Sequence, residues 1–66
     1  RLTDFRELLY AEFGTLRGDT LMSDHRLNEF GVTGDQAIES GVDLRRIWRA
    51  VCEAYEVPPA RRCASW

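Results

Sequence analysis

The chain has 66 residues, a length that allows one small domain with a single hydrophobic core. Apolar residues make up 44% of it and aromatic residues 11%, a composition that excludes an intrinsically disordered chain. The formal net charge of −2 argues against indiscriminate binding to nucleic acids.

The N-terminal part predicts one helix that runs from Leu2 to Phe13. Thr3 is its expected N-cap, because a threonine hydroxyl can accept a hydrogen bond from a free backbone N–H of the first turn. The apolar residues of this segment repeat at helical spacing and form one stripe, which comprises Phe5, Leu8, Leu9 and Phe13. Gly14 is the expected end of the helix.

Residues 17–19 are expected to form a connector, and a second helix is expected to begin at Asp19 or Thr20. The apolar residues of this second helix do not share one narrow face; they are Leu21, Met22, Leu27 and Phe30, together with His25. Either a helix buried on two sides or a helix broken near His25 would explain that pattern. Gly31 and Gly34 mark the connector that follows.

Two further helices are predicted after this connector. Asp35 is the expected cap of a short helix that extends to Ser40, with Ala37 facing inward and Gly41 just past its end at positive φ. Asp43 is the expected cap of the last helix. Its apolar residues give the clearest stripe in the chain, namely Leu44, Ile47, Trp48, Val51 and Tyr55. Pro58 and Pro59 are expected to end this helix.

Strand-like alternation of apolar and polar residues is not apparent anywhere in the sequence. We therefore predict an all-α fold, a compact three- to four-helix bundle. Residues 1–66 form a single helical domain in this interpretation, with a helical core at 1–57 and a short C-terminal tail at 58–66.

The sequence resembles a family of short actinobacterial proteins classed as domain of unknown function 3046. The similar pieces span nearly the whole chain in order: Arg1-Leu2-Thr3 with Phe5, Phe13-Gly14, Asp24-His25 with Leu27, Gln36-Ala37-Ile38, Gly41-Val42-Asp43, Ile47 to Cys52, and Val57-Pro58. The chain departs from the family pattern in the loop at residues 31–34 and at Leu44. The resemblance implies a small helical protein without an assigned activity or cofactor.

Charge is distributed unevenly along the chain. Residues 18–43 carry one arginine against six acidic residues, a net charge of −5, whereas residues 44–66 carry five arginines against two glutamates, a net charge of +3. The arginine guanidinium suits recognition of carboxylates and phosphates. The candidate partner surface therefore consists of the arginines of the C-terminal part: Arg45, Arg46, Arg49, Arg61 and Arg62.

The C-terminal half also has features of a DNA-binding helix-turn-helix. The spacing from Ala37 to Gly41 is similar to the turn of such a unit, which makes the helix after Asp43 the would-be recognition helix. Register counts against this reading, because Leu44 and Trp48 would have to face the DNA although both belong to the apolar stripe. Nucleic-acid binding is kept as the alternative function.

Catalysis and metal binding find little support in the residue pattern. His25 is the only histidine, and no nucleophile motif accompanies it, so we expect its imidazole to hydrogen-bond a helix end or a carboxylate and to pack on aromatic rings. Cys52 and Cys63 are too few and too far apart for a disulfide framework or a zinc site. We expect Cys52 to be buried and Cys63 to be reactive. No catalytic, cofactor-binding or metal-binding residue is predicted.

The favoured function is a non-enzymatic interaction module that binds another protein, or a second copy of itself, through its last helix and tail. No apolar run approaches the ~18 residues of a membrane span, and no signal peptide opens the chain. We therefore expect a cytoplasmic protein with reduced cysteines that does not bind a membrane.

Overall fold

The structure, a computed structural model, describes residues 2–62. These residues form α1 (Leu2–Phe13), α2 (Thr15–Asp24), β1 (Arg26–Leu27), β2 (Val32–Thr33), α3 (Gly34–Glu39), α4 (Leu44–Ala54) and a 3₁₀ turn, η1 (Pro59–Arg61). The predicted helical fold is thus confirmed. The small antiparallel sheet was not expected, because two-residue strands are too short to leave an alternating pattern in a sequence.

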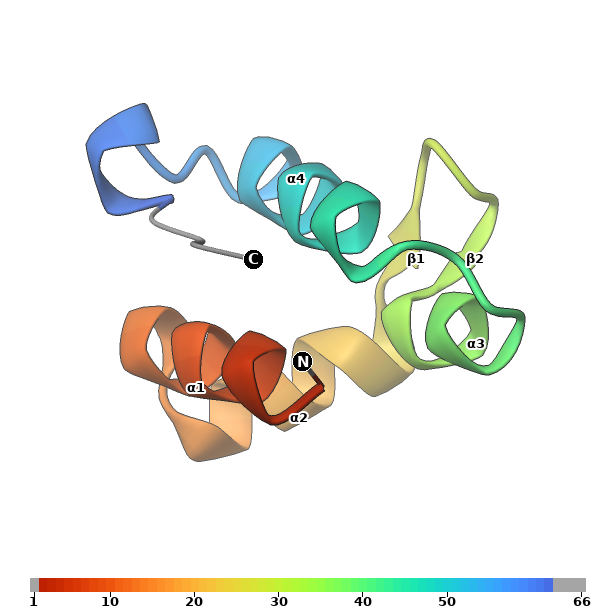
Figure 1. Cartoon of the computed structure of the whole chain (residues 1–66), viewed down its shortest axis with the longest axis horizontal. Helices are drawn as coiled ribbons and strands as arrows, with labels where there is room; N and C mark the ends of the chain where they lie inside the picture. Colours follow the sequence, from red (N-terminus) through yellow and green to blue (C-terminus); the bar gives the residue numbers. More distant parts are fainter. Residues whose placement is uncertain (1, 63–66) are drawn as a thin grey trace.

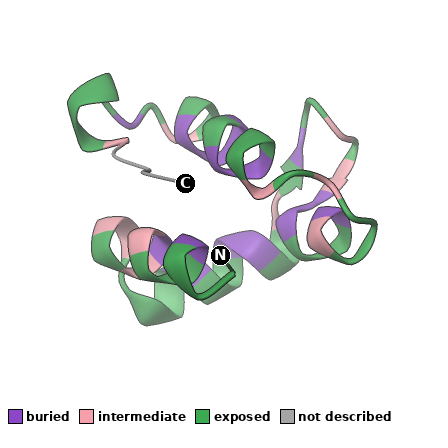
Figure 2. Cartoon of the chain, viewed as in Figure 1, coloured by how far each residue is buried: buried purple, intermediate pink, exposed green. Residues whose placement is uncertain are grey.

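The helices enclose one core (Figure 1). α1 and α2 pack against each other, α4 lies across from them, and α3 with the hairpin closes one end. In Figure 2 the buried residues lie on the parts of the helices that face one another. The core comprises Phe5 and Leu9 of α1, Leu21 and Met22 of α2, Leu27 of β1, Ala37 of α3, the α4 residues Ile47, Trp48, Ala50, Val51 and Cys52, and Val57 after α4. The predicted stripes of α1 and α4 supply five of these twelve residues, namely Phe5, Leu9, Ile47, Trp48 and Val51, while Leu8, Phe13, Leu44 and Tyr55 are partly buried against them.

The start of α1 and the start of α2 differ from the predictions. α1 already includes Leu2, so Thr3 lies inside the helix and is not its N-cap. Gly14, at φ +83°, breaks the helix as predicted, but α2 begins directly at Thr15. The predicted connector at residues 17–19, and the predicted start at Asp19 or Thr20, are therefore wrong.

Gly18 explains that error. It lies inside α2 and is buried against α1, where a Cβ would lie 3.0 Å from Tyr10 Cδ1 and 3.1 Å from Leu9 Cγ. The Tyr10 hydroxyl also donates a hydrogen bond to Asp19 Oδ1 across the same contact. The glycine allows two helices to approach closely, so it serves packing rather than a turn.

The second helix ends near His25, which agrees with the predicted alternative of a helix broken at that residue. α2 stops at Asp24, and His25 has an extended backbone that leads into β1. β1 pairs with β2 so that Leu27 lies opposite Val32. Gly31, at φ +71°, closes the connecting loop by donating its N–H to the Leu27 carbonyl at 2.8 Å.

α3 is capped by Thr33 rather than by Asp35. The Gln36 N–H donates to Thr33 Oγ1 at 3.2 Å, and the Thr33 N–H donates to Gln36 Oε1 at 3.1 Å, which together make a capping box. α3 therefore begins at Gly34, one residue before the predicted cap, and ends at Glu39, one residue before the predicted end. Gly41 has φ +85°, as predicted.

α4 begins as predicted, because Asp43 Oδ1 accepts the Arg45 N–H at 2.9 Å. It does not end at the prolines. The last helical residue is Ala54, and Glu56 follows in the left-handed region at φ +56°. The Val57 N–H donates to the Cys52 carbonyl at 2.8 Å, and the Glu56 N–H donates to the Glu53 carbonyl at 3.3 Å. This is a Schellman cap, which ends the helix before Pro58 is reached.

None of the helices within residues 2–62 combines the length and apolar character needed to cross a membrane.

Candidate partner-binding surface

The first two turns of α4 have a buried apolar face and an exposed charged face. Ile47 and Trp48 are buried, and the Trp48 ring stands edge-on to Phe5, with centroids 6.0 Å apart and an interplanar angle of 87°. The three arginines of these turns, which are Arg45, Arg46 and Arg49, are all exposed. The helix thus has the two faces that the sequence predicts.

Arg46 is engaged within the chain. Its Nη2 lies 3.2 Å from Glu29 Oε2 in the loop between the strands, and its guanidinium lies 5.3 Å from the centre of the Phe30 ring. The ion pair and the cation–π contact fix this arginine against the hairpin. Arg46 therefore stabilises the fold at the hairpin and does not stand free for a partner.

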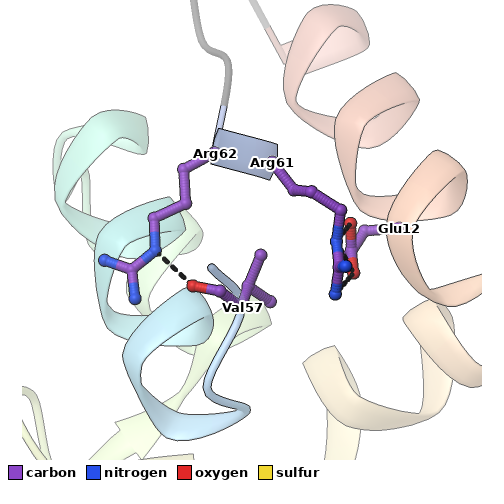
Figure 3. Close-up of polar contacts among 4 residues, drawn as sticks. All are labelled: Glu12, Val57, Arg61 and Arg62. Atoms are coloured by element: carbon purple, nitrogen blue, oxygen red, sulfur yellow. Dashed lines mark hydrogen bonds and ion pairs between the residues drawn. The ribbon is translucent and has the colours of Figure 1, made fainter. Parts of the chain in front are cut away.

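Arg61 and Arg62 are adjacent but point in opposite directions (Figure 3). Arg61 forms a two-oxygen pair with Glu12 of α1, with Nε at 3.3 and 3.2 Å from Oε1 and Oε2 and Nη2 at 3.2 Å from Oε2. Arg62 Nε donates to the Val57 carbonyl at 2.8 Å, which holds its side chain toward α4. η1 thus docks on α1 through one arginine and presents the other beside α4.

Arg45, Arg49 and Arg62 are brought together around one hollow of about 240 Å³, with Trp48 as its fourth lining residue. Arg45 Nε lies 3.8 Å from Asp43 Oδ1, a distance beyond hydrogen bonding. Within residues 2–62 no hydrogen bond or ion pair joins the Arg49 side chain to another group. Three cations therefore converge, and Asp43 is the one carboxylate of the described residues that forms an ion pair with any of them.

Trp48 was assigned to the core from its spacing alone, and nothing in the sequence indicates that it also lines this hollow. Its side chain is 3% exposed. Its Nε1 is the one buried side-chain nitrogen or oxygen of the described residues that has no hydrogen-bond partner. A buried N–H without an acceptor costs about 1–3 kcal/mol, and most native structures avoid it.

The five predicted surface residues thus fall into two groups. Arg46 and Arg61 are paired with Glu29 and Glu12, whereas Arg45, Arg49 and Arg62 share the hollow. We call the hollow and its three arginines the arginine hollow. The pairing of Arg46 with Glu29 joins the acidic middle of the chain to its basic C-terminal part within one molecule.

His25 lines a separate open hollow of about 400 Å³ between α2 and the end of α4. Its ring lies 5.2 Å from that of Tyr55, so the expected aromatic packing is present. The expected hydrogen bond of the imidazole to a helix end or a carboxylate is not formed with any group of residues 2–62. The Thr20 hydroxyl in the same hollow donates to the Leu16 carbonyl at 2.9 Å.

Cys52 is fully buried in α4. Desolvation raises the pKa of its thiol to about 11, although the nearby Arg62 acts in the opposite direction. Such a thiol is a poor nucleophile at neutral pH. Cys63 lies outside the described residues. Within residues 2–62, no three or more His, Cys, Asp and Glu side chains are grouped to hold a metal ion.

The sequence model of the family described as Protein of unknown function (DUF3046) matches residues 1–60 of the chain. The chain belongs to this family. No curated protein and no solved structure matches it. The longest similar piece, Ile47 to Cys52, contains five buried residues and one exposed arginine, Arg49. That piece therefore accounts for the core of the fold more than for the arginine hollow.

α3 and α4 are joined by a short turn, as in a helix-turn-helix, but the side chains are not arranged for DNA. Trp48 is buried and Leu44 is half-buried, although both occupy positions that would face the groove. Gln36 and Ser40, which such a unit would bury, are exposed. The register conflict expected from the sequence is therefore present in the structure.

Proposed function

We propose that this chain is a non-enzymatic module that binds another protein through the arginine hollow. The observation that carries the proposal is the division of the C-terminal arginines. Two of them form hydrogen-bonded ion pairs with glutamates of the same molecule, while Arg45, Arg49 and Arg62 surround a hollow where the one ion pair within residues 2–62 is the longer contact of Arg45 with Asp43, at 3.8 Å.

The placement of Arg45 and Arg49 supports a binding role. Both lie in the first two turns of α4, where a cation opposes the positive end of the helix dipole, and they are also one turn apart. Each of these effects costs a few tenths of a kcal/mol. Residues that weaken the local structure are expected where a function requires them.

Nucleic-acid binding remains the second candidate, and it has less support. Duplex DNA is bound by neutralising several phosphates over an extended surface. Arg46 and Arg61 are tied to carboxylates, and Glu53 and Glu56 are exposed on the later part of the same helix and its cap. The cluster of converging arginines therefore covers one small area, which suits the side chains of a protein better than a nucleic-acid backbone.

Affinity capture from a lysate of the source organism tests the proposal, with the wild-type protein compared with the double variant Arg45→Gln/Arg49→Gln. A matched control is Arg17→Gln/Arg26→Gln, which removes the same charge from two exposed arginines outside the arginine hollow. We expect one protein to be retained by the wild type and the control, with or without nuclease, and lost from the double variant. Retention that disappears with nuclease would instead favour the nucleic-acid alternative. Retention by the wild type and both double variants would mean that the contact lies elsewhere on the surface.

A further inference from the structure

The arginine hollow also has features that define the chemistry of its occupant. We infer that it receives an acidic side chain from an extended acidic segment of the partner, with a carboxylate held by Arg45, Arg49 and Arg62 and in reach of the Trp48 indole. This inference rests on the proposed function and specifies the partner of the same surface.

Charge is the first argument. Asp43 stands 3.8 Å from Arg45 and already bonds the backbone of the helix, so it leaves the group with an excess of positive charge. Arg62 is fixed through its Nε to Val57, which leaves its two terminal nitrogens available. Guanidinium groups in this arrangement match carboxylates, which they can bind through two parallel hydrogen bonds.

Size is the second argument. A volume of about 240 Å³ is below the range of ordinary small-molecule sites, about 300–1,000 Å³, and it accommodates one side chain rather than a cofactor. An acidic side chain can fill it from a peptide that lies across α4. Arg45 and Arg49, one helical turn apart, are then also placed to contact a second carboxylate of the same peptide.

The indole of Trp48 is the third and independent argument. Its N–H is buried and has no acceptor among residues 2–62, and the same residue forms part of the wall of the hollow. Because the N–H is itself buried, a carboxylate in the hollow can reach it only if the Trp48 ring shifts, and it would then supply the acceptor that this N–H lacks.

A second copy of the chain is a less suitable occupant. In a two-fold symmetric dimer one patch pairs with its own copy, residue i against residue j and j against i, so the three arginines would need acidic partners within the same patch. The acidic residues that could serve instead, Asp19, Asp35 and Glu39, line a different hollow formed by α1, α2 and α3. A contact between two different patches adds copies in a row and does not by itself close into a dimer.

NMR titration tests the inference directly. The probe is blocked hexaglutamate, with blocked hexaglutamine as the uncharged control, added to ¹⁵N-labelled protein that carries Trp66→Phe so that one indole signal remains. We expect saturable shifts of the backbone signals of Arg45, Arg49 and Arg62, and a downfield shift of the indole proton of Trp48. In the Arg45→Gln/Arg49→Gln variant the Kd should rise at least tenfold, whereas in Arg17→Gln/Arg26→Gln it should change less than twofold.

Four results would overturn the inference. One is the absence of saturable shifts with hexaglutamate, and another is tighter binding of inorganic phosphate or a 20-base-pair duplex than of hexaglutamate. A third is concentration-dependent association of the protein alone that the arginine substitutions abolish. The fourth is an indole proton that is already downfield in the free protein and moves upfield when residues 63–66 are deleted, since the chain itself would then fill the hollow.

The two experiments separate the inference from the proposed function. Suppose that the wild type captures a protein that the double variant loses while hexaglutamate does not bind. In that case the proposed protein-binding function is retained, and the inference that the partner supplies an acidic segment is wrong. If neither experiment shows an effect of Arg45 and Arg49, both proposals are wrong. A spectrum of the double variant with the same dispersion as the wild type confirms that it is folded.

Discussion

Cys52 shows at the scale of one residue how burial governs chemistry. Its thiol is fully buried among apolar side chains, and desolvation raises its pKa to about 11. The neutral thiol is therefore the form that the folded state accepts, while the thiolate is stable only when the chain has opened. The same burial should control both the reactivity of the residue and the pH dependence of stability.

In a Cys63→Ser background, which leaves Cys52 as the one thiol, a maleimide should label the native protein at least about a hundredfold more slowly than the urea-unfolded protein at neutral pH. Because the folded-state pKa of Cys52 lies above the ordinary value of 9.0, the contribution of this thiol to stability should be fully present below about pH 9 and should be lost as the pH rises toward 11. Urea midpoints across this range measure the fall, and Cys52→Ala should lack it. Rapid labelling of the native protein would mean that α4 is not packed as described.

The C-terminal caps of α3 and α4 have the same backbone geometry but different residues at the key position. Both end in the same pattern of backbone hydrogen bonds, and the residue just past the helix lies in the left-handed region in each case. In α3 this residue is Gly41 and in α4 it is Glu56. A side chain in that region is strained, by roughly 1–2 kcal/mol, whereas glycine is not.

Glu56→Gly should therefore raise the free energy of unfolding by about 0.5–1 kcal/mol, because it removes the strain at the α4 cap. Gly41→Ala should lower it by about 1 kcal/mol through backbone strain alone, since a Cβ at that position would meet no atom within 4 Å. Chemical denaturation of both variants measures the two changes. Loss of stability in Glu56→Gly would show that the glutamate side chain contributes more than its backbone costs.

The start of α3 allows a second comparison at this scale. The Thr33 side chain closes the capping box with Gln36 and is 9% exposed, whereas Asp35 is exposed in the first turn. Thr33→Ala should cost about 1 kcal/mol through loss of the cap. Asp35→Ala should cost less than about 0.5 kcal/mol, which is the usual size of a helix-dipole effect. Thermal unfolding compares them, and equal losses would speak against the capping box.

For the whole molecule, the pair between Arg61 and Glu12 joins the C-terminal turn to the first helix. The Glu12 side chain is 18% exposed and that of Arg61 is 60% exposed, so solvent screens the pair in part. Its contribution should be at the level of surface pairs, about 0–1 kcal/mol. It connects residues 49 positions apart, which no local pattern in the sequence could indicate.

A double-mutant cycle with Glu12→Gln and Arg61→Gln should give a coupling free energy of about 0.5–1 kcal/mol in low salt, and this value should fall in ~0.5 M NaCl. Urea denaturation of the four proteins provides the measurement. Arg17→Gln, which removes an exposed arginine that forms no ion pair within residues 2–62, is the control. A coupling that is zero in low salt would mean that η1 docks through apolar contacts alone.

The sequence by itself determined the helical class, the inward faces of α1 and α4, the cap at Asp43 and the positive φ of Gly41. These features depend on spacing along one helix or on the chemistry of a single turn, so neighbouring residues suffice to specify them. The capping box is also a local pattern, Thr33 followed three positions later by Gln36, and it competes in the sequence with the cap predicted at Asp35.

Only the tertiary structure decided the features that depend on distant residues. In the sequence Gly18 suggests a turn, yet it lies within α2, where a Cβ would come within 3.0 Å of Tyr10 and 3.1 Å of Leu9 in α1. The five C-terminal arginines are equivalent in sequence, and the positions of Glu29 and Glu12 leave three of them around Trp48. Which arginine side chains remain available to a partner depends on where the carboxylates lie in three dimensions. The net charge of a sequence segment does not contain that information.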